Sequence, residues 1–256
     1  AVLILGLHLL PQTEARVFYQ KALRDSRPEV RSVALAQVAS LQDTELVTAA
    51  VGEYEQLNPV DRAALLKALA IRGDRRFVGV PRQALSAKEP RVIAAACSAL
   101  AVLGDATDVK PLLARAQQTD GAAALTALGR ITGPGVAAAI GQAMAAATGK
   151  AKAGLVDLLV KRGEPAGAQW LLKAVSDEDR NVRKDALKGL GALGDPSHRD
   201  ALLAMLNQDL GSASQRAPYE SCAGALLRRH AGEAGASETC LAAMEKATPE
   251  GRGSLL

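Results

Sequence analysis

The sequence predicts an all-α protein, a right-handed α-solenoid of stacked antiparallel helical hairpins with about 31 residues per repeat. Three observations predict it: a composition that favours helices, an apolar pattern that recurs along the chain, and glycine and acidic residues that separate the copies. A lone hairpin cannot bury its apolar stripe, so neighbouring hairpins must stack and shield one another.

The composition favours closely packed helices. Hydrophobic residues make up 48% of the 256 residues, but aromatic residues only 2%, so the core must consist of Leu, Ala and Val. Ala and Leu lead the helix propensity order, whereas strands are enriched in β-branched and aromatic residues. The length exceeds that of a usual compact domain, yet one array of repeats can reach it. We therefore predict a single repeat array over residues 1–256.

The repeated unit begins with a helix whose apolar residues follow steps of four, four and three. This spacing marks one face of an α-helix, because a strand would alternate every second residue. Two further copies, less complete, contain Leu65, Leu69 and Gly73 and then Leu155, Leu159 and Gly163. The three clearest copies align as Val30, Ala34, Leu35, Val38, Leu41, Asp43; Val92, Ala96, Cys97, Leu100, Leu103, Asp105; and Val182, Ala186, Leu187, Leu190, Leu193, Asp195.

Each first helix is expected to end at a marker residue, usually glycine, that comes just before an acidic residue or a turn. Glycine there predicts a left-handed residue at the helix end, and the acid that follows can cap a second helix. The second apolar runs include Leu46 and Ala50, and later Leu202 and Leu206. The end markers are Gln42, Gly73, Gly104, Gly129, Gly163 and Gly194, with Gly232 expected for the unit near Cys222.

Two segments carry a resemblance to a known family. The runs from Asp25 to Arg31 and from Asp177 to Arg183, each followed by Ala-Leu, resemble bacterial HEAT repeats of the PBS-lyase HEAT-like type. The resemblance covers nearly the whole chain, more weakly over 121–148 and after 208. It implies that Asp25, Arg31, Asp177 and Arg183 brace the turns between neighbouring repeats rather than bind a ligand.

The chain is expected to be an excerpt of a longer repeat protein. The repeat step places Ile4, Leu7 and Leu10 inside a first helix, and residues 249–256 superpose on 59–66. Truncated repeats are therefore predicted at both ends. The unit over about 208–235 fits the pattern poorly, and its surplus residues, 210–218, are expected to form a loop.

Residue types that carry chemistry are sparse, and we predict no catalytic, cofactor-binding or metal-binding residues. Cys97, Cys222 and Cys240 have no metal-type spacing and are interpreted as buried thiols. A di-iron hydroxylase of this architecture uses paired His-Glu dipeptides, which the three histidines here do not form. Trp170 lies beside Leu171 and is interpreted as a packing residue. No stretch is long and apolar enough to span a membrane.

One segment concentrates positive charge, although the net charge is only +4. Eight Lys and Arg residues between positions 62 and 91 face only Asp74 and Glu89. Such a cluster can bind an acidic partner, protein or nucleic acid, although a solvated, locally neutralised face is the simpler interpretation. The candidate partner-binding patch consists of Arg62, Arg72, Arg75, Arg76 and Arg82.

These observations lead to three hypotheses on function. The first is a non-enzymatic scaffold that binds another protein through an extended surface. The second is an accessory repeat segment of a larger multidomain bacterial enzyme, secreted sugar-acting enzymes included. The third is nucleic-acid binding through the basic patch.

Overall fold

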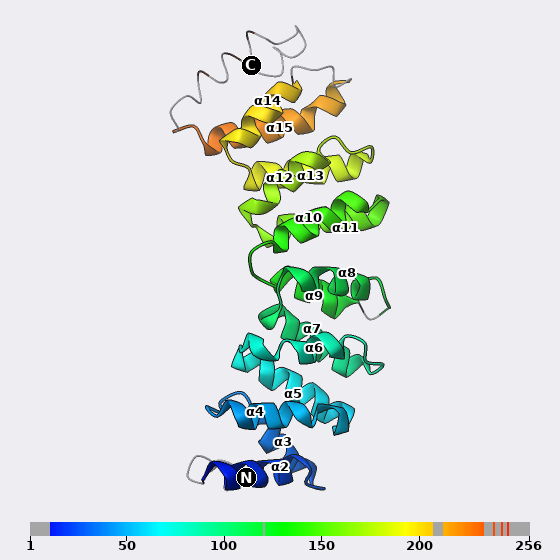
Figure 1. Cartoon of the computed structure of the whole chain (residues 1–256). Coiled ribbons are helices and arrows are strands. Elements are labelled where there is room, and N and C mark those ends of the chain that lie inside the picture. Colours follow the sequence, from blue (N-terminus) through cyan, green and yellow to red (C-terminus); the bar gives the residue numbers. More distant parts are fainter. Residues whose placement is uncertain are drawn as a thin grey trace. The chain divides into compact units, whose positions relative to one another are not determined.

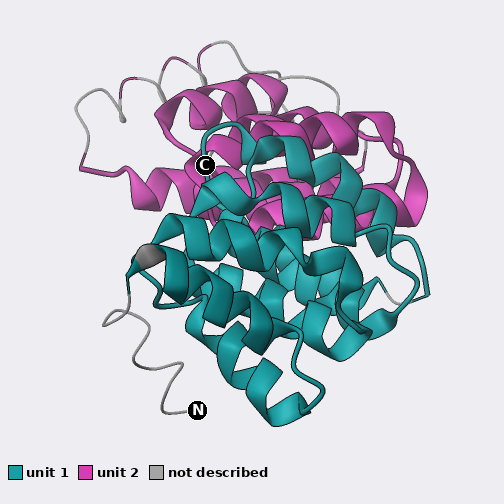
Figure 2. Ribbon diagram, turned by 60° about the horizontal axis from the view of Figure 1, so that its bottom comes forward, with its two compact units in different colours: residues 1–136 teal, residues 137–256 magenta. Residues whose placement is uncertain are grey.

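The structure, a computed structural model, describes residues 11–119, 121–206 and 212–232, together with residues 238, 242 and 245. It falls into two compact units, residues 1–136 and residues 137–256 (Figure 2). Every regular element among the described residues is helical, which confirms the predicted all-α solenoid class. The single array over residues 1–256 stays a prediction.

In the first unit, first helices alternate along the chain with second helices (Figure 1). Successive first helices pack side by side, α3 against α5, α5 against α7 and α7 against α9. The first helices are α3 (Pro28–Gln37), α5 (Pro59–Arg72), α7 (Pro90–Leu103) and α9 (Ala122–Arg130); the second helices are α2 (Gln12–Leu23), α4 (Thr44–Gly52), α6 (Gly79–Ala84) and α8 (Val109–Ala116).

The second unit repeats this arrangement. Its first helices α11 and α13 pack together, as do α13 and α15. Short 3₁₀ turns precede or follow several second helices in both units, η2 (Tyr54–Gln56), η3 (Arg75–Phe77), η4 (Ala106–Asp108) and η5 (Pro165–Gly167). The α-helices of this part are α10 (Val136–Ala146), α11 (Gly149–Arg162), α12 (Ala168–Ala174), α13 (Arg180–Leu193), α14 (Pro196–Leu206) and α15 (Ala213–Arg229).

The predicted apolar stripes form the core. The aligned residues of the first helices are almost completely shielded from water, which is the burial that each hairpin needs from its neighbours. Val30, Leu41 and Leu193 are only partly buried, and Leu41 lies beyond the end of α3 at Gln37. The fully buried members of the stripes include Ala34, Leu35, Val38, Ala96, Cys97, Leu100, Ala186, Leu187 and Leu190.

Four of the predicted markers directly follow the end of a first helix, but by two different mechanisms. The markers Gln42 and Gly232 were wrong, because α3 already ends at Gln37 and α15 at Arg229. Gly73 and Gly163 adopt the expected left-handed conformation, with φ of 73° and 68°. The expectation was wrong for Gly104 and Gly194, whose φ values of −74° and −65° suit any residue. Glycine fits there because a β-carbon would lie 2.5 Å from the Leu100 carbonyl oxygen or 2.7 Å from that of Leu190.

After four of the markers the acidic residue caps the next helix, as predicted, whereas Glu164 after Gly163 makes no such hydrogen bond. A carboxylate that accepts from a backbone N–H satisfies one of the donors left open at a helix start. Asp43 accepts from the Glu45 amide at 2.8 Å, and the same contact recurs from Asp74 to Arg76, from Asp105 to Thr107 and from Asp195 to Ser197.

Two sequence expectations fail in the weaker parts of the repeat. Gly129 does not end a helix, because α9 continues to Arg130, and Leu125 is 52% exposed instead of buried. The expected loop over 210–218 is wrong from position 213, where α15 begins. Because α15 has 17 residues against 14 in α13, part of the surplus lengthens a first helix. The expected truncated repeats at 1–10 and 249–256 lie outside the described residues.

Close approach of first helices in the second unit depends on Gly189 in α13. A β-carbon there would lie 2.3 Å from Val160 Cγ2 of α11, so neighbouring atoms would have to move. Gly154 in α11 is also helical, but a β-carbon there would meet nothing within 4 Å.

We predict that Gly189→Ala lowers the free energy of unfolding by about 1–3 kcal/mol, because overpacking a tight contact forces side chains or backbone to shift. The matched variant Gly154→Ala should be neutral or stabilise by up to about 1 kcal/mol, since alanine is the better helix former. Urea denaturation followed by circular dichroism measures both. Equal effects of the two substitutions would contradict the close contact between α11 and α13.

Candidate interaction surfaces

The braces predicted from the repeat are present in both units. The Arg31 guanidinium donates to the carbonyl oxygens of Asp25 at 2.7 Å and Ser26 at 3.0 Å. The Arg183 guanidinium donates in the same way to Asp177 and Glu178, at 2.6 and 2.8 Å. Each arginine therefore holds the turn that precedes its own first helix, in agreement with the structural role inferred from the resemblance.

Arg31 also reaches the next repeat. Its Nε lies 2.6 Å from Asp61 Oδ2, and both side chains are largely buried, with 18% and 7% of their surfaces exposed. Asp61 occupies the place of Val92 and Val182 in the aligned copies, so a carboxylate replaces a core side chain. Asn58 donates a second hydrogen bond to the same oxygen at 2.6 Å.

We predict that Asp61→Val, which installs the residue found in other copies, destabilises the chain by about 3 kcal/mol. The reason is that removing one partner leaves Arg31 as a buried, uncompensated charge. The double variant Arg31→Met/Asp61→Val should regain at least half of that loss in urea denaturation. A single variant as stable as the unmodified chain would show that the pair contributes nothing.

The five arginines of the predicted patch do not gather into one free surface. Each donates to a carbonyl or carboxylate oxygen of this chain, and no two of them share an acceptor residue in these contacts. Arg62 donates to the carbonyls of Tyr54 and Glu55 at 3.2 and 2.7 Å. Arg75 makes only a long contact, 3.5 Å, with the Thr132 carbonyl.

Arg72 connects neighbouring repeats, whereas Arg76 pairs mainly with Asp74 in its own turn. Arg72, only 13% exposed, reaches back to the carbonyls of Val38, at 3.3 Å, and Leu41. Cations are favoured beside the carbonyl groups that end a helix. Arg76 Nη2 lies 2.6 Å from Asp74 Oδ2, and the hydrogen bond from Arg76 lowers the pKa of Asp74 to about 2.

Arg82 is the most fully paired member of the patch. Its guanidinium donates to Asp108 Oδ1 at 2.7 Å and to Asp105 Oδ2 at 3.1 Å. The Asp108 side chain is 2% exposed, and its hydrogen bond raises the pKa of Arg82. Asp108 also accepts from the Asp105 amide, so Arg82 neutralises the carboxylates that start η4 in the following repeat.

The patch stays a prediction, but this geometry favours a structural role for Arg62, Arg72, Arg76 and Arg82. Two other cations of the segment 62–91 are not paired in this way. Lys67 and Arg91 are exposed, and within the described part of the chain neither takes part in a hydrogen bond or ion pair.

Lys67 and Arg91 border a groove on the exposed side of the first helices α5 and α7. The groove has a volume of about 640 Å³. Its lining is otherwise small or apolar, and it consists of Val60, Ala63, Ala64, Ala70, Ile71, Ala95, Ser98 and Val102 besides the two cations. We call it the α5/α7 groove.

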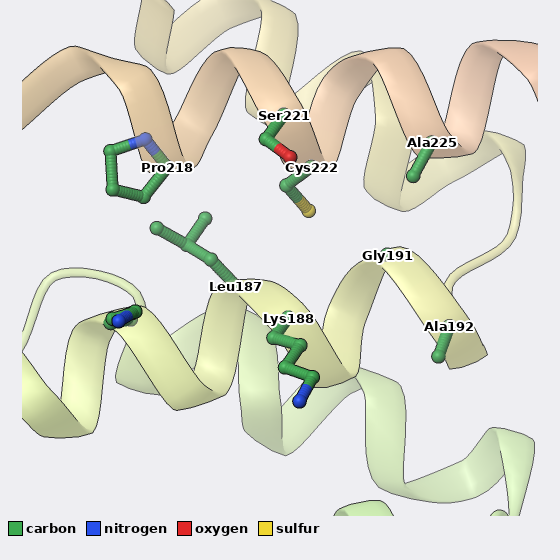
Figure 3. A pocket seen from close by; sticks show the side chains of 9 residues that line it. Leu187, Lys188, Gly191, Ala192, Pro218, Ser221, Cys222 and Ala225 are labelled. Atoms are coloured by element: carbon green, nitrogen blue, oxygen red, sulfur yellow. The ribbon is translucent and has the colours of Figure 1, made fainter.

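A second groove, of about 500 Å³, lies between α13 and α15 in the second unit. Figure 3 shows Leu187 and Gly191 of α13 facing Pro218 and Cys222 of α15 across it. Lys184 and Lys188 also line it. We call it the α13/α15 groove.

The side chains suited to catalysis are engaged in packing or capping. Cys97 and Cys222 are buried thiols, as predicted, and burial raises the pKa of Cys222 to about 12. His198 Nδ1 lies 2.6 Å from Asp195 Oδ1 at the start of α14. Cys240 and His8 lie outside the described residues. Among the residues that the structure describes, no three His, Cys, Asp or Glu side chains are grouped to hold a metal ion.

Trp170 packs against α10, as its sequence context suggested. A β-carbon on Gly141 would lie 2.1 Å from the indole Cδ2, so only glycine admits the ring at that position. Lys173 Nζ lies 4.3 Å from the centre of the ring. Among the helices that the structure describes, none is long and apolar enough to cross a bilayer.

Hairpins that repeat along the chain and stack on their neighbours define an α-helical repeat protein. Residues 137–217 match the family model described as HEAT repeats, which confirms the predicted resemblance to HEAT repeats. No curated protein matches the chain.

Solved structures similar to this chain are helical repeat proteins of low sequence identity. Human deoxyhypusine hydroxylase in complex with glycerol is 17% identical over 88% of each chain, with a TM-score of 0.39. The complex of CpcE and CpcF of phycocyanin lyase from Nostoc sp. PCC7120 is 20% identical over 91% of this chain and 94% of that one, with a TM-score of 0.42. An engineered protein is 16% identical over 98% of this chain and 79% of its own, with a TM-score of 0.37.

Proposed function

We propose that the chain is a non-enzymatic scaffold that binds another protein through the exposed sides of its stacked helices. The observation that carries this proposal is the α5/α7 groove, where apolar side chains are left in contact with water. Exposed apolar patches rimmed by polar groups are typical of protein interaction sites. HEAT repeats generally mediate protein interactions, which agrees with this role.

The ionisable side chains support the same proposal. A nucleophilic cysteine needs a lowered pKa, whereas burial raises the pKa of Cys222. His198 shares the capping of α14 with Asp195, whose pKa falls to about 2, first because of the Ser197 hydroxyl and then because of His198. These groups stabilise helix ends and the core, and none of them lines the α5/α7 groove.

Nucleic-acid binding is the weaker hypothesis. It requires arginines that can reach phosphates. Four of the five patch arginines already donate to oxygens of this chain. Arg62, Arg76 and Arg82 do so at 2.7 Å or less, and Arg72 donates to the carbonyls of Val38 and Leu41. Binding a phosphate would compete with those contacts.

We predict that the immobilised full chain retains a specific protein from lysates of the cells that produce it, and that the purified protein binds with a defined stoichiometry in titration calorimetry. A matched control is the same chain kept unfolded by alkylation of its cysteines in urea, because it preserves composition and charge. The proposal fails if folded and unfolded chains retain the same proteins, or if retention depends on added nucleic acid.

A further inference from the structure

We infer that the α5/α7 groove binds an amphipathic helix of a partner protein, with aliphatic side chains along one face and carboxylates beside them. The inference rests on the proposed scaffold function and adds to it the binding surface and the chemistry of the partner. It is argued from the apolar lining, the small residues of the floor and the charge at the rim.

Exposed apolar side chains concentrate in this groove. Among the described residues five large hydrophobic side chains are exposed, and three of them line it, Val60 at 56%, Ile71 at 67% and Val102 at 45%. Ile71 and Val102 are one 31-residue step apart, so neighbouring repeats place them at equivalent positions near the ends of α5 and α7. The corresponding residue of the preceding copy is Ser40, which is polar.

The floor of the groove is built from alanine. Its lining includes Ala63, Ala64 and Ala70 of α5 and Ala95 of α7, all of them partly buried. Short side chains let another helix approach closely, because its ridge of side chains can enter the space between two neighbouring helices. A helix of 14 residues such as α5 is about 21 Å long. An occupant of three to four turns therefore matches the groove in length, which is the helix-in-groove mode of recognition.

The charge at the rim selects the partner. Lys67 and Arg91 line the groove, and no acidic side chain does. Neither cation has a hydrogen-bond or ion-pair partner within the described residues. Arg62 and Arg72, which lie on α5 with Lys67, do form such contacts. Complementary charge steers association and fixes the register of a bound segment. Carboxylates on either side of the partner's apolar stripe would meet these two cations.

Two other occupants fit less well. A second copy docking through the same groove would bring the cations of both copies together, which is unfavourable. A nucleic acid would engage Lys67 and Arg91 but would leave Val60, Ile71 and Val102 against a charged backbone. The α13/α15 groove has Lys184 and Lys188 but no strongly exposed large apolar residue, so it serves as a charge-matched control.

The test uses the full chain and a fluorescein-labelled, stapled helical peptide of about four turns. The peptide carries leucines along one face and glutamates on both sides of that face. We expect binding in fluorescence anisotropy, weakened at least about tenfold by Ile71→Glu/Val102→Glu and by Lys67→Glu/Arg91→Glu. The variant Lys184→Glu/Lys188→Glu, which changes charge by the same amount in the other groove, should bind like the unmodified chain.

A charge swap makes the test independent of folding defects. A second peptide, with lysines in place of the glutamates, should bind the Lys67→Glu/Arg91→Glu chain more tightly than it binds the unmodified chain. Equal affinity of all chains for the acidic peptide would overturn the inference, as would competition by a DNA duplex that displaces it from the groove. If the captured partner still binds both groove variants, the scaffold function stands and the α5/α7 assignment is wrong.

Discussion

Contacts between neighbouring first helices are the interaction on which the rest of the structure depends. The apolar stripes of these helices are buried against one another, and Gly189 shows how little room the interface leaves for an extra carbon. Arginine side chains add a second type of contact. Arg72 reaches the carbonyls at the end of the preceding first helix, and Arg229 makes the equivalent contact with Ala192. Each repeat is therefore completed by groups from its neighbour.

This dependence explains which features the sequence could predict. The apolar stripes of the clearest copies, four aspartate caps and the left-handed glycines Gly73 and Gly163 are local signals, and these were predicted correctly. Gly104 and Gly194 carry the same sequence signal for another reason, the proximity of a carbonyl oxygen one turn earlier. The sequence alone does not distinguish these two causes, because glycines of both kinds end a helix and precede an acidic residue.

The surface was harder to predict than the core. An excess of arginine between positions 62 and 91 suggested a free basic patch, but the carboxylates that engage Arg82 lie 23 and 26 residues further along the chain. A count over a local segment cannot include them. The repeat register did contain a usable signal. Ile71 and Val102 recur at an outward position 31 residues apart, and Lys67 lies four residues before Ile71.

Amide hydrogen exchange of the intact chain at increasing urea tests most directly whether the repeats stabilise one another. In the first unit, the account predicts that α5 and α7, each packed between two first helices, exchange more slowly than α2 and open together. Equal protection of all hairpins, each opening independently of its neighbours, would contradict it.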